Sequence, residues 1–383
     1  MNDFSDKALL PAGMCDVLPP DAECEAAATE RLIACFSAHG YDRVKPPLIE
    51  FEESLLDGSG AAMSGQTFRL MDPVSQRMMG VRADMTLQVA RIATTRMKNS
   101  PRPLRLCYGG QVLRIRGTQM RPERQFGQVG SELLGSQDPQ ADAEVILMAV
   151  EALSDVGVKD LSIDLALPTL VPALLGKIDL DDESRDTLRV ALDRKDEAAV
   201  GALSKKLGKA TTDQLTAMLK ATGPADDALA ALTKLKLPKA AANELASLAQ
   251  VVEKIRSAAA DLSLTVDPVE SRGLEYHSGV TFTIFSTGVR GELGGGGRYL
   301  AGSEDEPATG MTLFMDSVLR AIAPAEAKKR LYLASGTDNA EGRKLRAEGW
   351  ITIDGLENGD DAKKEAKRLG CSHYLSNGKV HAC

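Results

Sequence analysis

The chain has 383 residues, enough for a substantial core and more than one domain, and its 43% hydrophobic and 26% charged residues are typical of a globular protein. Its net charge of −8 argues against broad electrostatic binding to nucleic acid or to an anionic membrane. No signal peptide or run of 18 apolar residues is present, and the six cysteines form no CxxC pair, so we expect a cytoplasmic protein with free thiols.

The N-terminal half predicts alternating helices and strands. Residues 23–38 have the amphipathic pattern of a helix, and Gly40 follows as its stop. Asp84 or Thr86 lies where another helix begins. The remaining predicted elements are extended segments at 41–51 and 67–82, strands at 104–116, 123–134 and 161–167, and a helix at 140–155.

The composition changes at about residue 170. Residues 170–260 are rich in Ala, Leu, Lys, Asp and Glu and have no aromatic residue. They predict a helical insertion, with breaks near Gly208, Gly223 and Pro238. Strands are then predicted at 262–266, 276–285 and 289–294, and a helix at 307–322.

After a short linker, residues 330–383 alternate strand, helix, strand and helix, and end in a hairpin. This order predicts a small α/β domain. The order of elements in the main body indicates an α+β fold, in which helices lie against a mostly antiparallel sheet. We therefore predict a core domain over residues 1–322, containing the insertion, and a C-terminal domain over residues 328–383.

A glycine run, GGGGRY, occupies residues 294–299. It lacks the Lys and Ser/Thr of a phosphate-binding P-loop, and a flexible loop is one interpretation. Another is a strand that lets a ligand or another backbone approach closely, with Arg298 and Tyr299 beside a pocket.

Residues 124–132, RQFGQVGSE, form part of a predicted strand whose alternation places Gln128, Gly130 and Glu132 on one face. The absent side chain of Gly130 would leave room for a ligand there. An ordinary solvent-facing strand is the alternative, and the pattern alone favours it.

The C-terminal hairpin contains four potential zinc ligands. A two-residue turn at Asn377-Gly378 would pair residue 373 with 382 and place the potential ligands on opposite faces, whereas a three-residue turn would bring them together. Because Asn-Gly favours the two-residue turn, we expect no metal site in this set, which is Cys371, His373, His381 and Cys383.

Several segments, taken in order, resemble the histidyl-tRNA synthetase family. PAGMCDVLPP is similar to its N-terminal signature, GYDRVKPPLIEFEESL to its dimer-forming motif 1, and LRIRG with RQFGQVGSELLG to its motif 2. SRGLEYHSG is similar to its histidine-binding signature, and GGGGRY with ATGMTLFMDSVLRA to its motif 3. The resemblance implies a class II synthetase-like fold over about residues 8–322 and a dimer formed through the motif 1 region.

The resemblance also implies a pocket for L-histidine. Asp84, Thr86 and Gln128 would lie near the ligand ammonium, Glu132 would accept from the imidazole N–H, and Arg272 would pair with the carboxylate. Tyr276, His277 and Tyr299 would line the remaining wall, and Arg114 survives from motif 2. A zwitterionic amino acid requires these kinds of partner.

The sequence departs from the synthetase pattern where ATP would bind. Arg116 stands at the acidic position of motif 2, and Ser317 replaces the ATP-clamping arginine of motif 3. Loss of a bidentate guanidinium and reversal of a charge make amino-acid activation improbable. Asp84 in place of Glu, and His277 in place of Tyr, are milder changes in the histidine pocket.

This combination resembles the regulatory subunits of ATP phosphoribosyltransferase, which act in the first step of histidine biosynthesis. It implies a non-catalytic subunit without a cofactor, which activates a short-form catalytic subunit and takes part in histidine feedback inhibition. Two alternatives remain at this stage: a divergent histidyl-tRNA synthetase, and a histidine- or tRNA-sensing interaction module. The short and not strongly basic C-terminal segment argues against tRNA binding.

Overall fold

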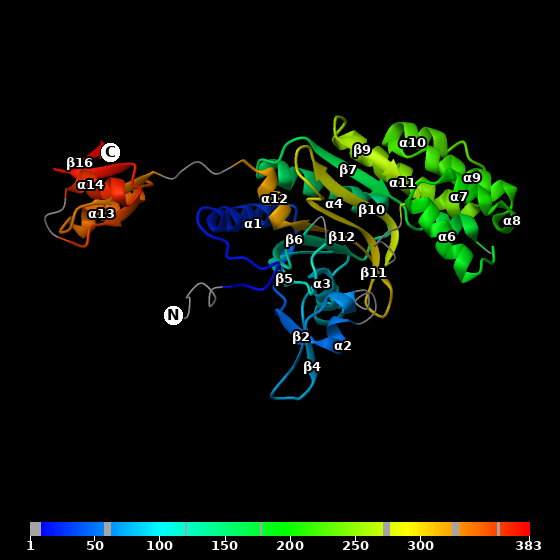
Figure 1. Cartoon of the computed structure of the whole chain (residues 1–383), viewed down its shortest axis with the longest axis horizontal. Helices are drawn as coiled ribbons and strands as arrows, with labels where there is room; N and C mark the ends of the chain where they lie inside the picture. Colours follow the sequence, from blue (N-terminus) through cyan, green and yellow to red (C-terminus); the bar gives the residue numbers. More distant parts are fainter. Residues whose placement is uncertain are drawn as a thin grey trace. The chain divides into compact units, whose positions relative to one another are not determined.

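The computed structural model describes residues 9–56, 63–118, 121–176, 178–270, 276–323, 329–357 and 361–383. They form two compact units, one that ends at Ala323 and one formed by the rest of the chain (Figure 1). Each unit has its own sheet and its own hydrophobic core.

A nine-stranded, mostly antiparallel sheet is the centre of the first unit. Its strands lie in the order β1-β5-β6-β12-β11-β10-β7-β9-β8, in which β1–β5 and β7–β9 are parallel pairs. This arrangement confirms the predicted α+β class. The strands are β1 Asp42–Arg43, β5 Leu104–Leu113, β6 Gln125–Leu134, β7 Leu161–Ala166, β8 Gly223–Pro224, β9 Ser263–Asp267, β10 His277–Ser286, β11 Gly294–Ala301 and β12 Glu306–Phe314.

Helices cover both faces of this sheet. On one face, α1 (Asp21–Ala38) and α4 (Pro139–Asp155) pack against each other and against β5 and β12. On the other face, α3 (Thr86–Arg91) continues into a π-helical turn, η3 (Ile92–Arg96), beside a second core cluster. Successive side chains of β6 point to opposite faces of the sheet, so alternate residues of this strand pack in the two clusters.

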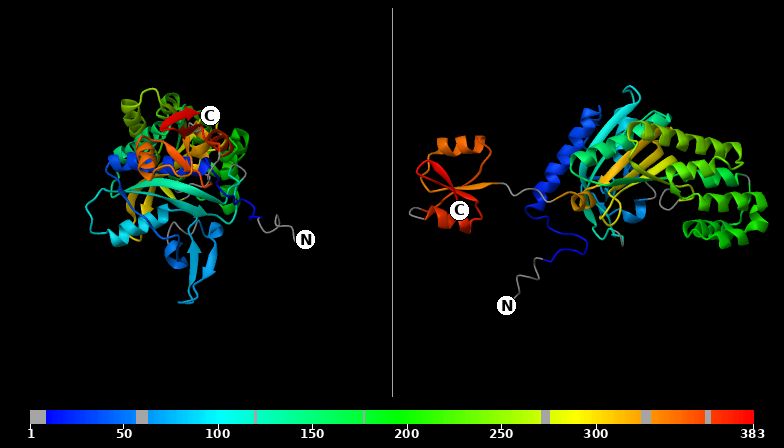
Figure 2. Two further views of the ribbon diagram at one scale, coloured as in Figure 1. Left: turned by 90° about the vertical axis from the view of Figure 1, so that its left-hand side faces the viewer. Right: turned by 90° about the horizontal axis from the view of Figure 1, so that it is seen from above.

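The predicted helical insertion is present and gathers beside β9 (Figures 1 and 2). The apolar faces of its helices belong to the core of the first unit, because α11 (Lys239–Ala258) packs on both α4 and α5 (Leu170–Leu175). The helices are α5 Leu170–Leu175, α6 Asp182–Asp193, α7 Glu197–Ala202, α8 Ser204–Leu207, α9 Lys209–Lys220, α10 Ala225–Leu232 and α11 Lys239–Ala258. Gly208, Gly223 and Pro238 lie at breaks between them, as the sequence predicts.

A three-stranded antiparallel sheet lies next to α2 (Glu52–Leu55), in the order β2-β4-β3. Its strands are β2 Ile49–Phe51, β3 Arg69–Met71 and β4 Met78–Val81. The extended segment predicted over residues 67–82 is therefore confirmed, as two strands joined by a turn.

Two predictions around the glycine run are wrong. Residues 307–314 form β12 rather than a helix, and the helix α12 (Met315–Ala321) begins only after them. The segment becomes a strand because β6 and β11 hydrogen-bond to its two edges, a tertiary constraint that overrides the local pattern. The strand expected at 289–294 begins only at Gly294 and contains the glycine run itself.

The second unit has a four-stranded sheet in the order β14-β13-β15-β16, formed by β13 Arg330–Leu333, β14 Ile351–Asp354, β15 His373–Ser376 and β16 Lys379–Ala382. The helices are α13 Asn339–Ala347 and α14 Ala362–Arg368. The hairpin turn has the predicted two residues, because His373 pairs with Ala382 and Ser376 with Lys379. The ring of His373 packs against Trp350, whereas that of His381 stacks on Tyr374.

Candidate ligand-binding site

A cavity of about 430 Å³ opens beside β6, β10, β11 and β12. Its volume is in the range of small-molecule sites. Seven of the predicted site residues line it together: Asp84, Thr86, Arg114, Glu132, Tyr276, His277 and Tyr299. Of the two others, Gln128 does not line the cavity but hydrogen-bonds to the lining residue Asp84, and Arg272 lies outside the described residues.

Glu132 is the most deeply buried carboxyl group of the lining. The Tyr299 hydroxyl donates to its Oε2 at 2.9 Å, and the Tyr108 hydroxyl donates to its Oε1 at 3.2 Å. Burial raises the pKa of Glu132 to about 8, although these hydrogen bonds act in the opposite direction. With this pKa, the neutral and charged forms of the Glu132 carboxyl group are both accessible near neutral pH.

Asp84 is held at the start of α3 by its neighbours. Its Oδ1 accepts from the Thr86 N–H at 2.8 Å, and its Oδ2 accepts from Gln128 Nε2 at 2.8 Å. Gln128 in turn accepts from the Met85 N–H at 3.0 Å. Gln128 therefore orients Asp84, and the Asp84 carboxylate faces the cavity.

The space above Gly130 is already filled. Gly130 pairs with Tyr108 on β5, and a Cβ added at Gly130 would lie 2.4 Å from the Tyr108 hydroxyl. The prediction that Gly130 leaves room for a ligand is therefore wrong. The glycine accommodates Tyr108, whose hydroxyl also contacts Thr86 at 3.1 Å and Thr312 at 2.9 Å.

Arg114 supplies positive charge among the described lining residues. Its Nη2 lies 3.9 Å from Asp84 Oδ2, and its Nε donates to the Ala83 carbonyl at 3.3 Å. Burial lowers the pKa of the Arg114 guanidinium, and the Asp84 carboxylate opposes that shift. At these distances the Arg114 guanidinium can donate hydrogen bonds to a ligand carboxylate. The Asp84 carboxylate can still accept from a ligand ammonium group.

Aromatic rings form the opposite wall. His277 pairs with Tyr299 across β10 and β11, and the Tyr276 and His277 ring centroids are 3.9 Å apart. The glycine run of β11 lines the same wall without side chains. A flat ring can therefore lie along this strand, which agrees with the interpretation of the glycine run as one side of a pocket. Tyr299 lines the cavity as predicted, whereas the prediction for Arg298 is wrong, because its guanidinium pairs with Asp142 at 2.6 Å instead.

Arg121 lies beside Ser317, the residue that the synthetase resemblance places at the motif 3 arginine position. Its guanidinium lies 3.7 Å from the Phe314 ring centroid and 5.1 Å from that of Phe126. It forms ion pairs with Glu292 at 3.1 Å and Asp316 at 3.2 Å. The chain's own cation thus occupies the space between two aromatic rings and two carboxylates.

Ser317, which the synthetase resemblance places at the motif 3 arginine position, is part of this cluster. It is buried, and its hydroxyl accepts from Arg320 at 3.0 Å and from Arg121 at 3.4 Å. Arg116, in contrast, is exposed. The Ser317 hydroxyl therefore accepts hydrogen bonds from guanidinium groups of the chain itself.

Sequence reasoning missed Tyr108 and Arg121. Tyr108 is opposite Gly130 only because of the register between β5 and β6. Arg121 lies in the loop between those strands, and its contacts come from β6, β12 and α12. If the two strands are paired as a hairpin around the 117–122 loop, Tyr108 falls close to Gly130, so the sequence could have indicated this contact. No local pattern indicates the partners of Arg121.

The matching family model is described as histidyl-tRNA synthetase, and it covers residues 13–318. Two curated relatives are named ATP phosphoribosyltransferase regulatory subunit. The protein from Paramagnetospirillum magneticum is 57% identical, over 98% of this chain and 98% of its own length. The one from Rhodospirillum centenum is 56% identical, over 97% and 96%.

The chain belongs to the ATP phosphoribosyltransferase regulatory subunit family. Members of this family are regulatory subunits by name, so the chain has a non-catalytic role. Family membership also confirms the resemblance stated from the sequence motifs.

Solved structures support the class II synthetase-like fold. A regulatory subunit/histidyl-tRNA synthetase from Bacillus halodurans has a TM-score of 0.80 and 24% identity, over 96% of this chain and 97% of that one. A histidyl-tRNA synthetase from Nostoc has a TM-score of 0.77 and 17% identity, over 97% and 91%. Within the described residues, no helix combines the length and apolar character needed to cross a membrane.

Proposed function

We propose that this regulatory subunit binds L-histidine in the cavity, assembles with a short-form ATP phosphoribosyltransferase catalytic subunit in the cytoplasm, and both activates that subunit and conveys feedback inhibition. The observation that carries the histidine assignment is the Glu132 carboxyl group, held by two tyrosine hydroxyls and facing a cavity that also contains Asp84 and Arg114. These groups match an imidazole, an ammonium and a carboxylate, respectively.

The chemistry of the cavity supports one orientation of the ligand. The imidazole would lie along the glycine run of β11 with one ring N–H donating to Glu132. The ammonium would lie between Thr86 and Asp84, and Gln128 holds the Asp84 carboxylate in place. The ligand carboxylate would reach Arg114, and Arg272 would join it, as the family resemblance implies.

The Arg121 cluster supports a subunit that does not activate amino acids. An adenine ring would have to displace a guanidinium that is stacked on Phe314 and paired with two carboxylates. Breaking a buried ion pair leaves uncompensated charges, which costs about 3–5 kcal/mol. Together with Ser317 and Arg116, this opposes productive ATP binding.

Linkage is the mechanism of regulation in this proposal. Histidine would favour the assembly state in which the catalytic partner is less active, because it binds that state more tightly. The reciprocal statement also holds: the assembly state must change the histidine affinity by the same factor.

Isothermal titration of the purified chain with L-histidine and, separately, with ATP–Mg tests the cavity. We expect histidine to bind and ATP–Mg not to bind, and we expect Glu132→Ala to abolish histidine binding. ATP binding would instead favour a divergent synthetase and would require an aminoacylation assay. No histidine binding by the chain or by its complex would overturn the ligand assignment.

Co-purification with a short-form catalytic subunit tests the partner. We expect a stable complex with higher phosphoribosyltransferase activity than the partner alone, and inhibition by histidine that Glu132→Ala removes. A chain that binds histidine but neither assembles with nor activates this partner would be a histidine-sensing module of another pathway.

A further inference from the structure

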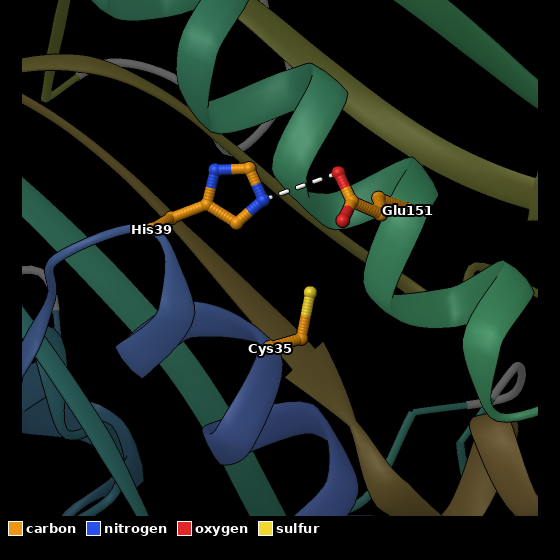
Figure 3. Close-up of side chains that lie close together, drawn as sticks. All are labelled: Cys35, His39 and Glu151. Carbon is orange, nitrogen blue, oxygen red and sulfur yellow. Dashed lines mark hydrogen bonds and ion pairs between the residues drawn. The ribbon is translucent and has the colours of Figure 1, made fainter.

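Three side chains with different donor atoms meet between α1 and α4 (Figure 3). They are Cys35 and His39, at the end of α1, and Glu151 on α4. One donor atom from each lies within 4.8 Å of the other two, and His39 Nε2 is 3.1 Å from Glu151 Oε2. This cluster lies on the sheet face covered by α1 and α4, whereas the Glu132 side chain faces the other side of β6.

Helix geometry brings the first two groups together. Residues 35 and 39 are separated by four positions, so their side chains project from the same face of the helix end. Glu151 comes from a helix 112 residues away and faces this pair. Figure 3 shows all three side chains directed into the space between the two helices.

The local field favours a cation. The cluster lies at the C-terminal end of α1, where unpaired carbonyl groups concentrate negative potential, and the last turn of that helix has no Lys or Arg. The Glu151 and Asp155 carboxylates act electrostatically on the Cys35 side chain. Arg31 donates to the Asp155 backbone carbonyl. The two carboxylates would stabilise a divalent cation bound between the helices.

We propose that Cys35, His39 and Glu151 form a three-ligand site for Zn²⁺, with a fourth position open to water. A thiolate, an imidazole nitrogen and a carboxylate oxygen are the donors that Zn²⁺ takes in proteins. Bond lengths of about 2.0–2.3 Å place the donors of a tetrahedral site about 3.5 Å apart, so modest side-chain rotations close the cluster. His39 and Glu151 are exposed enough to rotate and to admit the ion from solvent.

Zinc binding exchanges the thiol proton of Cys35 for the metal ion. Zn²⁺ displaces the thiol proton of Cys35, which is released to solvent, and neutral His39 donates the lone pair of Nε2. The ion thereby replaces the His39–Glu151 hydrogen bond and connects α1 to α4. The cysteine spacing gave no indication of this site, because its ligands come together only through the packing of the two helices.

A competition titration with a chromophoric zinc chelator tests the site in the full chain, after chelator treatment and removal of any purification tag. We expect one equivalent of Zn²⁺ with a dissociation constant of micromolar or tighter, at least tenfold weaker binding in Cys35→Ser and in Glu151→Gln, and release of at least one proton per ion at pH 7. Substituting Co²⁺ should give thiolate-to-metal charge-transfer absorption that Cys35→Ser removes.

The tail variant His381→Ala/Cys383→Ser is the matched control, because it removes one histidine and one cysteine from the C-terminal set that is expected to form no metal site, and it should bind Zn²⁺ like the wild type. Glu151 is exposed, so Glu151→Gln keeps the test meaningful if Cys35→Ser fails to fold. Absence of stoichiometric binding, or binding lost in the tail variant but kept in Cys35→Ser and Glu151→Gln, would overturn the proposal. Neither result bears on histidine binding.

Discussion

At the scale of single residues, Glu132 is a fully buried carboxyl group. It is buried beside Tyr108 and Tyr299, and no cation contacts it in the described part of the chain. Desolvation therefore dominates its protonation, and the hydrogen bonds from the tyrosines only moderate the effect. A ligand N–H that donates to this carboxyl group would favour its charged form.

The first prediction concerns the stability of the folded state against pH. The pKa of Glu132 rises from 4.5 to about 8 on folding, so the folded state binds more protons than the unfolded state between these values. The free energy of unfolding therefore falls as pH rises from about 4.5 to 8, by about 3–5 kcal/mol from this group alone. Glu132→Gln should flatten the decrease, as measured by urea unfolding at pH 5 and pH 8.

Glu144 provides the comparison for that experiment. It pairs with Arg105, which holds its pKa below the usual value, so its removal should not flatten the decrease between pH 5 and 8. If Glu132→Gln and wild type lost the same stability over this range, the assignment of Glu132 as a mostly neutral group would be wrong.

The second prediction concerns Arg121. Arg121→Ala should lower the free energy of unfolding by about 3 kcal/mol, because it removes the cation that pairs with Glu292, leaves Asp316 paired with Arg320, and uncovers two phenylalanine rings. Arg121→Lys should recover only part of the loss, since an ammonium group does not reproduce the planar stack and the forked pairing. Chemical denaturation measures both, and an Arg121→Ala loss under 1 kcal/mol would contradict the role assigned to the cluster.

At the scale of elements, β12 decides the shape of the cavity. Its Gly310 pairs with Glu132 on β6, and a Cβ at this position would overlap the Glu132 carboxyl group. Glycine is therefore required here by close approach and not by a turn. The same strand separates β6 from β11, so it also determines how far Glu132 lies from the glycine run.

The third prediction follows from that contact. Gly310→Ala should displace Glu132 and weaken histidine binding at least tenfold, as measured by isothermal titration. Gly109→Ala on β5 is the matched control, because its added Cβ would make ordinary contacts at 3.5 Å or more with Thr29, Ile33 and Val129. Equal histidine affinity of the two variants would show that the carboxyl position does not control binding.

The fourth prediction concerns the dimer that the resemblance to synthetase motif 1 implies. Leu48, Ile49, Met71, Val74 and Met78 are exposed apolar residues on or beside the β2-β4-β3 sheet, and Val74 is 91% exposed. Exposed apolar patches commonly mark interfaces. Leu48→Lys/Met71→Lys should raise the dimer dissociation constant at least tenfold in sedimentation velocity experiments.

Leu356→Lys is the control for the dimer prediction, since Leu356 is 94% exposed in the other compact unit. It should leave the self-association unchanged. A dimer that both variants retain would exclude the motif 1 region as the interface.

At the scale of the whole molecule, the two compact units have separate cores. Leu331, Leu333, Leu345 and Leu375 form one cluster of the C-terminal unit, and the cavity is lined entirely by residues of the first unit. The fifth prediction is that a chain ending at Ala323 folds and binds histidine within about twofold of the full chain, as measured by circular dichroism and isothermal titration. An aggregated or non-binding truncation would show that the first unit depends on the second.

The sequence by itself determined the fold class, most helices, the helical insertion and the family. These features depend on local periodicity and on ordered motifs: the amphipathic pattern of α1, the breaks at Gly208 and Pro238, and the Asn377-Gly378 turn are all properties of neighbouring residues. Most predicted site residues also come from such motifs, and they line one cavity.

Only the tertiary structure decided which groups meet across the sheet and between helices. Residues 307–314 became a strand because two neighbouring strands bind their backbone, and Tyr108 filled the space over Gly130 because of strand register. Arg121 and the Cys35–His39–Glu151 cluster acquired their partners from segments distant in the chain. Hydrogen-bond pairing and side-chain packing act between residues that are far apart in sequence, so a local pattern does not contain them.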